Sequence, residues 1–138
     1  MNRNDLQQLA EARLLDATVL LNAGRLDGAY YLLGYVVECA LKACISKQFG
    51  LYEVPDKNLV RDFYSHDLKD LLKIAGLSVE AAAKTRADPN FETNWTTVRN
   101  WRETTRYNIG VGEAKVRTLL NAVISIDSGV LTWLRTQW

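Results

Sequence analysis

Residues 27–49 restrict the fold of this 138-residue chain more than any other stretch. Between residues 29 and 45 the only charged side chains are Glu38 and Lys42, and most of the others are apolar or aromatic. A helix that is apolar on nearly all sides is a buried central helix. The stretch therefore predicts a central helix with other helices packed around it, and we expect Asp27 to cap its start.

One side of this helix carries polar groups. At about 100° per residue, four side chains fall within roughly 60° of one another and form a polar stripe: Tyr31, Tyr35, Glu38 and Lys42. Glu38 and Lys42 are four residues apart, in the order that favours an ion pair on a helix. The stripe is either a satisfied structural network or the floor of a site. We interpret its residues as support for a site on another segment or for a dimer contact.

Helical periodicity and capping residues predict further helices, and no segment shows the sustained period-two alternation of a strand. The predicted helices span residues 4–23, 27–50, 66–76, 78–87, 94–107 and 113–136. Residues 51–65 lack clear periodicity and are predicted to form a long loop. The length suits one domain over residues 1–138, and short connections favour antiparallel neighbours, so we predict a single all-α domain.

Two lone charges interrupt the apolar stripes of the first and last predicted helices. Arg13 lies in the middle of the first stripe, and Asp127 lies in the middle of the last. Arg13 could extend its charged end to solvent, but a charge that stays buried needs a partner of opposite sign. We therefore predict an ion pair between Arg13 and Asp127.

Composition limits the chemistry that the chain can carry. The net charge of +1 excludes a strongly basic nucleic-acid binder. The single histidine excludes a histidine-rich metal cluster, and no Walker A or dinucleotide-binding motif is present, so we expect no metal and no cofactor. We expect Cys39 and Cys44 to be buried free thiols. With no apolar signal core and no run long enough to span a membrane, the protein is expected to be cytoplasmic without a membrane partner.

A basic ridge is the best candidate for a binding surface. One face of the helix predicted there carries an aromatic residue and three arginines, spaced i, i+4, i+7 and i+11: Trp95, Arg99, Arg102 and Arg106. Three guanidinium groups beside an aromatic ring suit an anionic ligand that can stack, such as a nucleotide or single-stranded nucleic acid. The alternative is a solvated helix face with Glu103 as a partial counter-charge.

Three short segments, in this order, resemble the HEPN family of small helical domains: Glu38-x-x-Leu41-Lys42, His66-Asp67-Leu68 and Arg106-Tyr107. The family is named for its occurrence in higher eukaryotes and prokaryotes and for nucleotide binding, and the resemblance covers residues 9–134. It implies an up-and-down bundle of four or five helices that commonly forms a homodimer. Members often work beside a small nucleotidyltransferase, and many act as metal-independent ribonucleases in toxin or defence systems.

The ribonuclease members use an arginine followed, four to six residues later, by a histidine near a late helix. Arg106 stands where such an arginine is expected, but residues 111–113 hold no histidine. The departure argues against the family's usual active site and favours a protein that is not an enzyme. Arg61 and His66 have the family's arginine-to-histidine spacing, but they lie before the third predicted helix and not near a late one. We therefore interpret His66 as a structural residue.

The first of three hypotheses is a HEPN-type module that binds a nucleotide or RNA without cleaving it. Arg99, Arg102 and Arg106 would hold phosphates, since guanidinium groups bind them through paired hydrogen bonds. Trp95 or Tyr107 would stack a base. Such a module would belong to a toxin–antitoxin pair or another system with a nucleotidyltransferase.

Two other functions remain open. In one, the chain is a metal-independent ribonuclease toxin in which His66 acts as general acid or base and Arg61 stabilises the phosphate. In the other, it is a protein-interaction or dimerisation module that binds no nucleotide, and the ridge is only a solvated surface.

Overall fold

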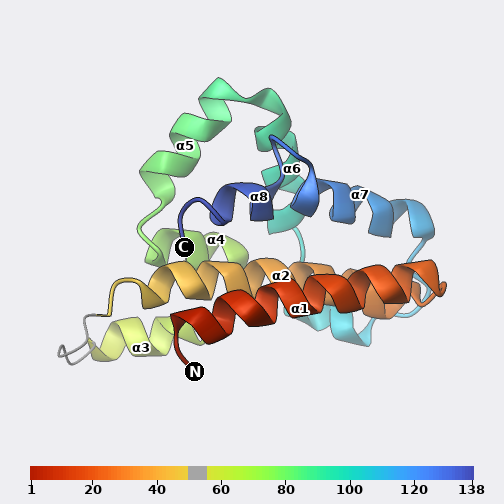
Figure 1. The fold of residues 1–138 in the computed structure, drawn as a ribbon, viewed down its shortest axis with the longest axis horizontal. Coiled ribbons are helices and arrows are strands. Elements are labelled where there is room, and N and C mark those ends of the chain that lie inside the picture. Colours follow the sequence, from red (N-terminus) through yellow and green to blue (C-terminus); the bar gives the residue numbers. More distant parts are fainter. Residues whose placement is uncertain (50–55) are drawn as a thin grey trace.

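The computed structural model describes residues 1–49 and 56–138. These residues form eight α-helices and one 3₁₀-helix, and none of them forms a strand (Figure 1). The helices are α1 Arg3–Asn22, α2 Leu26–Ser46, α3 Lys57–Phe63, α4 Leu68–Ile74, α5 Ser78–Ala87, α6 Pro89–Arg99, η1 Glu103–Tyr107, α7 Glu113–Ile124 and α8 Val130–Leu134. The all-α prediction is confirmed, but the helices are shorter and more numerous than the sequence pattern indicates.

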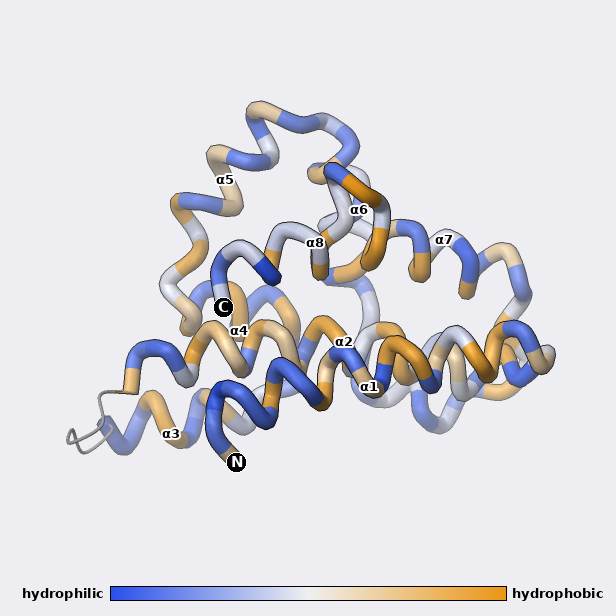
Figure 2. The backbone as a smooth tube through the Cα atoms, viewed as in Figure 1, coloured by the Kyte–Doolittle hydropathy of each residue, from blue (hydrophilic) through white to orange (hydrophobic). Residues whose placement is uncertain are grey.

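Helices α1 and α2 form a long antiparallel hairpin (Figure 1). Asn2 and Asp5 form a capping box at the start of α1, which satisfies backbone N–H groups that the first turn leaves free. The chain turns at Gly24, whose φ of 74° lies in the left-handed region that glycine adopts without a steric penalty. Figure 2 shows hydrophobic residues along much of α2, whereas hydrophobic and hydrophilic residues alternate along α1.

α2 is the central helix that the sequence predicts. Of its 21 residues, 13 are buried, because α1 covers one side and α4, η1, α7 and α8 pack against the others. By length and composition α2 could also cross a membrane. However, 72% of its apolar window is buried inside the structure, as in the core helix of a globular domain.

Asp27 does not cap α2, contrary to the prediction. The N-cap is Arg25, which makes no side-chain hydrogen bond there. The Asp27 carboxylate instead accepts hydrogen bonds from the backbone N–H groups of Gly110, at 3.2 Å, and Val111, at 2.8 Å. Asp27 therefore ties the loop after η1 to the start of α2.

Part of the predicted loop at residues 51–65 is helical. Residues 50–55 lie outside the described part of the chain, but residues 57–63 form α3. Asp56 caps this helix by accepting two backbone hydrogen bonds. The loop prediction is therefore wrong for α3, where a local cap starts a helix too short to show a periodic pattern.

One close contact fixes the segment between α6 and η1. Trp101 is completely buried, and its indole lies directly on Gly34 of α2. A Cβ atom at Gly34 would lie 2.0 Å from two indole carbons, so only glycine permits this approach. α6 ends at Arg99, and η1 forms separately after Trp101. The predicted continuous helix over residues 94–107 is therefore wrong.

The last predicted helix, over residues 113–136, is interrupted between α7 and α8. Asn94 donates from Nδ2 to Ser125 Oγ at 3.1 Å and to the Ser128 carbonyl at 3.0 Å. The Ser128 hydroxyl donates to Asp88 Oδ2 at 2.7 Å. Asn94 in α6 and Asp88, the N-cap of α6, thus hydrogen-bond polar groups of the break.

The predicted ion pair between Arg13 and Asp127 is wrong. The break leaves Asp127 exposed in the loop before α8, and Arg13 pairs with Asp16 on its own helix. A different ion pair joins α1 to the C-terminal end of the chain. Arg135 donates from Nε and Nη2 to the two carboxylate oxygens of Glu11, each at 2.7 Å.

Candidate functional site

The structure does not keep the predicted basic ridge on one helix face. Trp95 is only 8% exposed and packs in the core, so little of its ring is open to a base. Arg99 lines a groove between α5 and α6 with Trp95. Arg102 lies beyond the end of α6, exposed, and donates from Nη1 to the Arg99 carbonyl at 2.8 Å. Arg106 and Tyr107 belong to η1, outside the register of α6.

A buried carboxylate lies at the centre of a different group of side chains. Glu38 is 1% exposed, and its Oε1 accepts a hydrogen bond from Lys42 Nζ at 2.9 Å. The same oxygen lies 2.8 Å from His66 Nδ1. Glu38 Oε2 has no hydrogen-bond partner among residues 1–49 and 56–138. The predicted Glu38–Lys42 pair is confirmed, and the buried charge has one ammonium and one imidazole against it.

His66 reaches Glu38 from the connection between α3 and α4. The next residue, Asp67, caps α4 by accepting two backbone hydrogen bonds and so fixes where His66 lies. Because an ionised carboxylate only accepts hydrogen bonds, the contact with Glu38 places a proton on Nδ1. The side chain of His66 is 46% exposed, and its Nε2 lies 3.4 Å from Glu103 Oε2. One ring nitrogen therefore faces the buried acid and the other a partly exposed acid.

η1 supplies a second carboxylate, a guanidinium and an aromatic ring. Glu103 Oε1 lies 2.9 Å from Arg106 Nη1, so Glu103 is the counter-charge that the alternative interpretation of the ridge expects. The Arg106 guanidinium carbon lies 4.9 Å from the centre of the Tyr107 ring. The interaction with the Tyr107 side chain, followed by the charge of Glu103, raises the pKa of Arg106. Arg106 and Tyr107 are both exposed.

Tyr31 and Tyr35, the other members of the polar stripe, face the same segment. Their rings are stacked with centroids 6.2 Å apart, and the Tyr31 ring lies 6.0 Å from Trp101. Burial, followed by the neighbouring Cys39 thiol, raises the pKa of Tyr35 to about 12, so its hydroxyl stays protonated at neutral pH. Tyr31 therefore supports the segment that leads into η1, and Tyr35 supports Tyr31.

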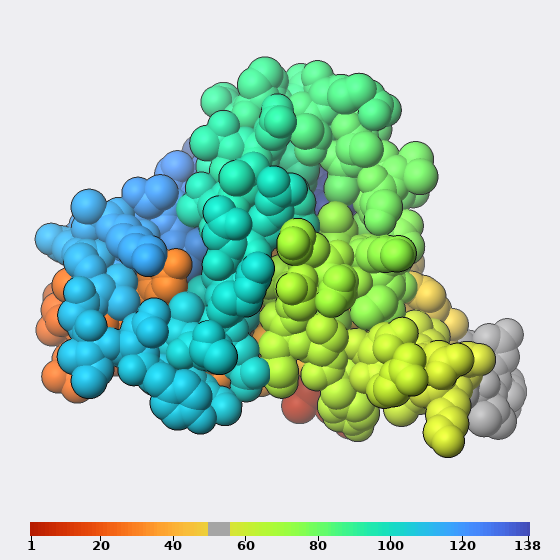
Figure 3. Space-filling model, turned by 180° about the vertical axis from the view of Figure 1, so that it is seen from behind, coloured from red at the N-terminus to blue at the C-terminus, as the bar shows by residue number. Residues whose placement is uncertain are grey.

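Six side chains thus meet between α2, the start of α4 and η1, and we call them the Glu38 cluster: Glu38, Lys42, His66, Glu103, Arg106 and Tyr107. Figure 3 shows the face on which η1 and the segment before α4 both reach the surface. The exposed side of the Glu38 cluster can bind an anion, stack a ring and move a proton at His66 Nε2.

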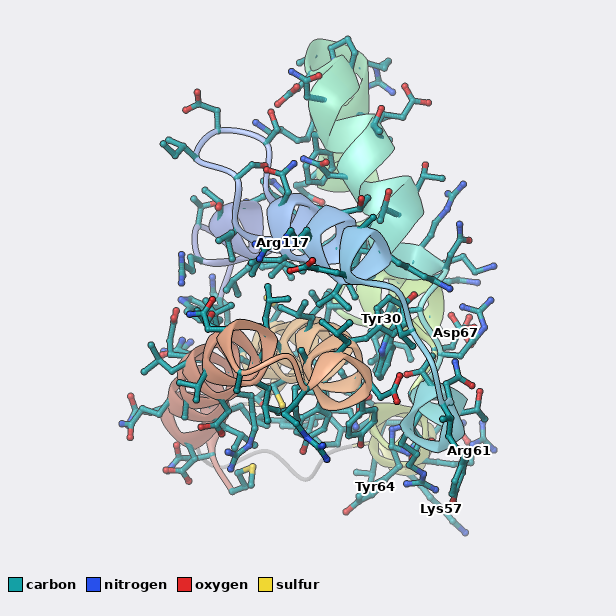
Figure 4. The ribbon with its side chains drawn as sticks, turned by 90° about the vertical axis from the view of Figure 1, so that its right-hand side faces the viewer. Tyr30, Lys57, Arg61, Tyr64, Asp67 and Arg117 are labelled. Atoms are coloured by element: carbon teal, nitrogen blue, oxygen red, sulfur yellow. The ribbon has the colours of Figure 1, made fainter. Side chains whose placement is uncertain are left out.

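Arg61 is not part of the Glu38 cluster. Its side chain is 74% exposed, and its Nε lies 3.3 Å from Asp62 Oδ1. Figure 4 shows Arg61 with Lys57 and Tyr64 on the outside of the molecule. Within the described part of the chain, no hydrogen bond or ion pair connects Arg61 to His66. The structure does not bring the two residues of the spacing match together.

Neither the contact between Glu38 and His66 nor the link through Glu103 is among the predictions from the sequence. A signal for the first was present, because a buried carboxylate needs donors and the chain has a single histidine. No group of three or more metal-ligating side chains occurs among the residues that the structure describes. A scan against models of known protein families finds no match, and neither curated proteins nor solved structures match the chain.

Proposed function

We propose that this chain is a HEPN-like helical module that binds a nucleotide or RNA through the exposed side of the Glu38 cluster, without cleaving it. The observation that carries the proposal is the Arg106–Tyr107 pair, a guanidinium 4.9 Å from the centre of an exposed ring. His66, linked to Arg106 through Glu103, adds an imidazole that donates from both nitrogens when protonated. Cationic donors beside a stacking ring suit a phosphate attached to a base.

Each exposed group has a distinct part in the proposed complex. The planar guanidinium of Arg106 binds the phosphate through two N–H groups, and protonated His66 donates from Nε2. Tyr107 offers the ring face that Arg106 leaves free to a base. Arg102, exposed just before η1, adds positive charge nearby. The buried ring of Trp95 has no part in this complex.

The position of the three HEPN-like segments supports the proposal. They lie far apart in the sequence, yet Glu38 and Lys42, His66, and the Arg106–Tyr107 pair all belong to the Glu38 cluster. With the resemblance we also propose an up-and-down arrangement of four or five main helices and a homodimer. We further propose a small nucleotidyltransferase as the partner in a cytoplasmic toxin–antitoxin or related two-component system.

Fluorescence anisotropy with a labelled single-stranded RNA, and with labelled ATP, tests the binding. Arg106→Lys keeps the charge but loses the planar fork and the contact with Tyr107, so we expect about tenfold weaker binding. The control is Arg61→Lys, the same change at an exposed arginine of α3, and it should alter affinity by less than about twofold. Equal affinity of Arg106→Lys and wild type would contradict the proposed site. Absence of RNA and nucleotide binding would favour the interaction module instead.

One observation favours a second function, that of a metal-independent ribonuclease. Glu38 holds the His66 ring by Nδ1 and leaves Nε2 at the surface, which is how a carboxylate orients a histidine that acts as general base. Arg106 would then stabilise the phosphate in place of Arg61. Cleavage of RNA in the presence of a metal chelator by wild type, but not by His66→Ala, would establish this function. Cleavage that survives in His66→Ala would remove His66 from the reaction.

A further inference from the structure

The Glu103 carboxylate lies between the two groups that would hold a phosphate. Its Oε1 is 2.9 Å from Arg106 Nη1, and its Oε2 is 3.4 Å from His66 Nε2. The Glu103 side chain is 26% exposed, so solvent reaches it without fully hydrating it. The carboxylate thus places one oxygen near the Arg106 guanidinium and the other near the His66 imidazole, as two oxygens of a bound phosphate would lie.

The charges around His66 are already matched in pairs. On the buried side Glu38 has Lys42 as its partner, and on the exposed side Glu103 has Arg106. A phosphate added to this arrangement would place its charge against Glu103, and like charges at contact distance repel when water is partly excluded. The phosphate and the Glu103 carboxylate therefore compete for Arg106 Nη1, and also for His66 Nε2 when the imidazole is protonated.

The backbone around Glu103 is anchored on both sides, so the side chain is the part that can move. Two residues earlier, Trp101 is fixed on Gly34 by its burial. After η1, Asp27 accepts a hydrogen bond from Gly110 N–H at 3.2 Å. A change of Glu103 rotamer would free Arg106 and His66 without moving either anchor.

We infer that Glu103 is a built-in competitor that occupies the anion position of the Glu38 cluster and swings out when a phosphate-bearing ligand binds. The inference rests on the proposed function, because it concerns the regulation of the same site. The binding free energy of a ligand is then only the difference between the free energy of its own contacts and that of the Glu103 contacts it replaces. Removing the Glu103 charge strengthens ligand binding instead of weakening it.

The test compares wild type, Glu103→Gln and Glu113→Gln by anisotropy with a fluorescein-labelled single-stranded RNA at fixed salt. Glu103→Gln removes the charge but keeps the shape and an acceptor for Arg106. Glu113 is exposed and pairs with Arg117 at 3.0 Å on α7, so Glu113→Gln controls for the change in net charge. We expect Glu103→Gln to bind RNA about tenfold more tightly than wild type, and Glu113→Gln to differ by less than about twofold.

The outcomes distinguish a failure of this inference alone from a failure of the proposed function. If wild type binds RNA and the affinity of Glu103→Gln rises no more than that of Glu113→Gln, the inference is overturned and the proposed binding stands. Weaker binding by Glu103→Gln overturns it too, because Glu103 would then position Arg106 for the ligand. If neither wild type nor Glu103→Gln binds RNA, both are overturned. Glu103→Asp keeps the charge on a side chain one methylene shorter, so it should show a smaller gain in affinity than Glu103→Gln. Thermal melting checks that each variant folds.

Discussion

Replacing Gly34 by alanine tests the contact that brings η1 to α2. The added Cβ would lie 2.0 Å from two carbons of the Trp101 indole and 2.3 Å from a third, so no small adjustment relieves the overlap. Trp101 is completely buried, and the indole is rigid. Either the indole leaves its place, or α2 and the segment before η1 move apart.

Both routes are costly. Overpacking a core costs about 1–3 kcal/mol, and losing a buried tryptophan costs about 3–5 kcal/mol. Alanine, in turn, is favoured over glycine inside a helix by about 1 kcal/mol. Because the overlap at Gly34 is too large for ordinary overpacking to absorb, we expect the indole to lose its packing, which is the costlier route. After the helix gain of alanine, Gly34→Ala should lower the free energy of unfolding by about 2–4 kcal/mol.

Urea unfolding followed by circular dichroism measures this loss, and Gly28→Ala is the matched control on the same helix. At Gly28 the added Cβ would meet Leu20 Cδ1 at 3.3 Å, the end of a flexible side chain. We expect the control to stay within about 1 kcal/mol of wild type. If Gly34→Ala were as stable as wild type, Trp101 would not lie on α2, and the position of η1 beside Glu38 would be wrong.

Three further perturbations test the buried and capping groups. Glu38→Gln should lower the free energy of unfolding by about 3 kcal/mol, measured in urea, because it leaves the Lys42 ammonium, whose side chain is only 11% exposed, without its counter-charge; an unchanged value would contradict the ion pair. Burial raises the pKa of Cys39 and of Cys44 to about 11, so a thiol reagent at pH 8 should react with them only after unfolding, and rapid reaction of the native protein would contradict their burial. The hydroxyl of Ser128 is the main cause that lowers the pKa of Asp88 below its ordinary 3.8. Because the folded pKa is the lower one, this stabilisation is present above pH 3.8 and is lost as the pH falls through the folded pKa. Ser128→Ala should therefore lower the melting temperature at pH 7 and have less effect in acid, whereas an equal loss at both pH values would contradict the role of Asp88.

The sequence alone predicts structural features that depend on residues close together in the chain. α2 could be predicted because burial on all sides leaves an apolar pattern within one stretch of chain. The Glu38–Lys42 pair follows from a spacing of four residues on the same helix. The thiols of Cys39 and Cys44 are buried because α2, the helix that carries them, is itself buried.

The helix breaks depend on contacts between distant segments, which periodicity does not reveal. Residues 94–107 keep helical spacing, but the packing of Trp101 on Gly34 separates α6 from η1. Residues 113–136 also keep helical spacing, but the hydrogen bonds that Asn94 makes across the break favour two separate helices. This break also explains why the predicted pair of Arg13 with Asp127 is wrong. The prediction placed Asp127 inside a helix, but Asp127 lies in the loop between α7 and α8.

The candidate site was predictable only in pieces. Glu38, His66 and Arg106 each stand out in the sequence for a separate reason. Their connection requires the separation of η1 from α6, which places Glu103 between His66 and Arg106. The spacing match of Arg61 with His66 is a local pattern without a corresponding contact among the described residues.

An NMR titration of isotope-labelled protein with single-stranded RNA tests whether Arg106, Tyr107 and His66 form one binding surface. The chain has one histidine, so its imidazole signals are unambiguous. We predict that the His66 imidazole signals and the backbone amides of η1 shift together as RNA is added. Shifts confined to the groove that Trp95 and Arg99 line, with the His66 signals unchanged, would contradict a binding surface at His66, Arg106 and Tyr107.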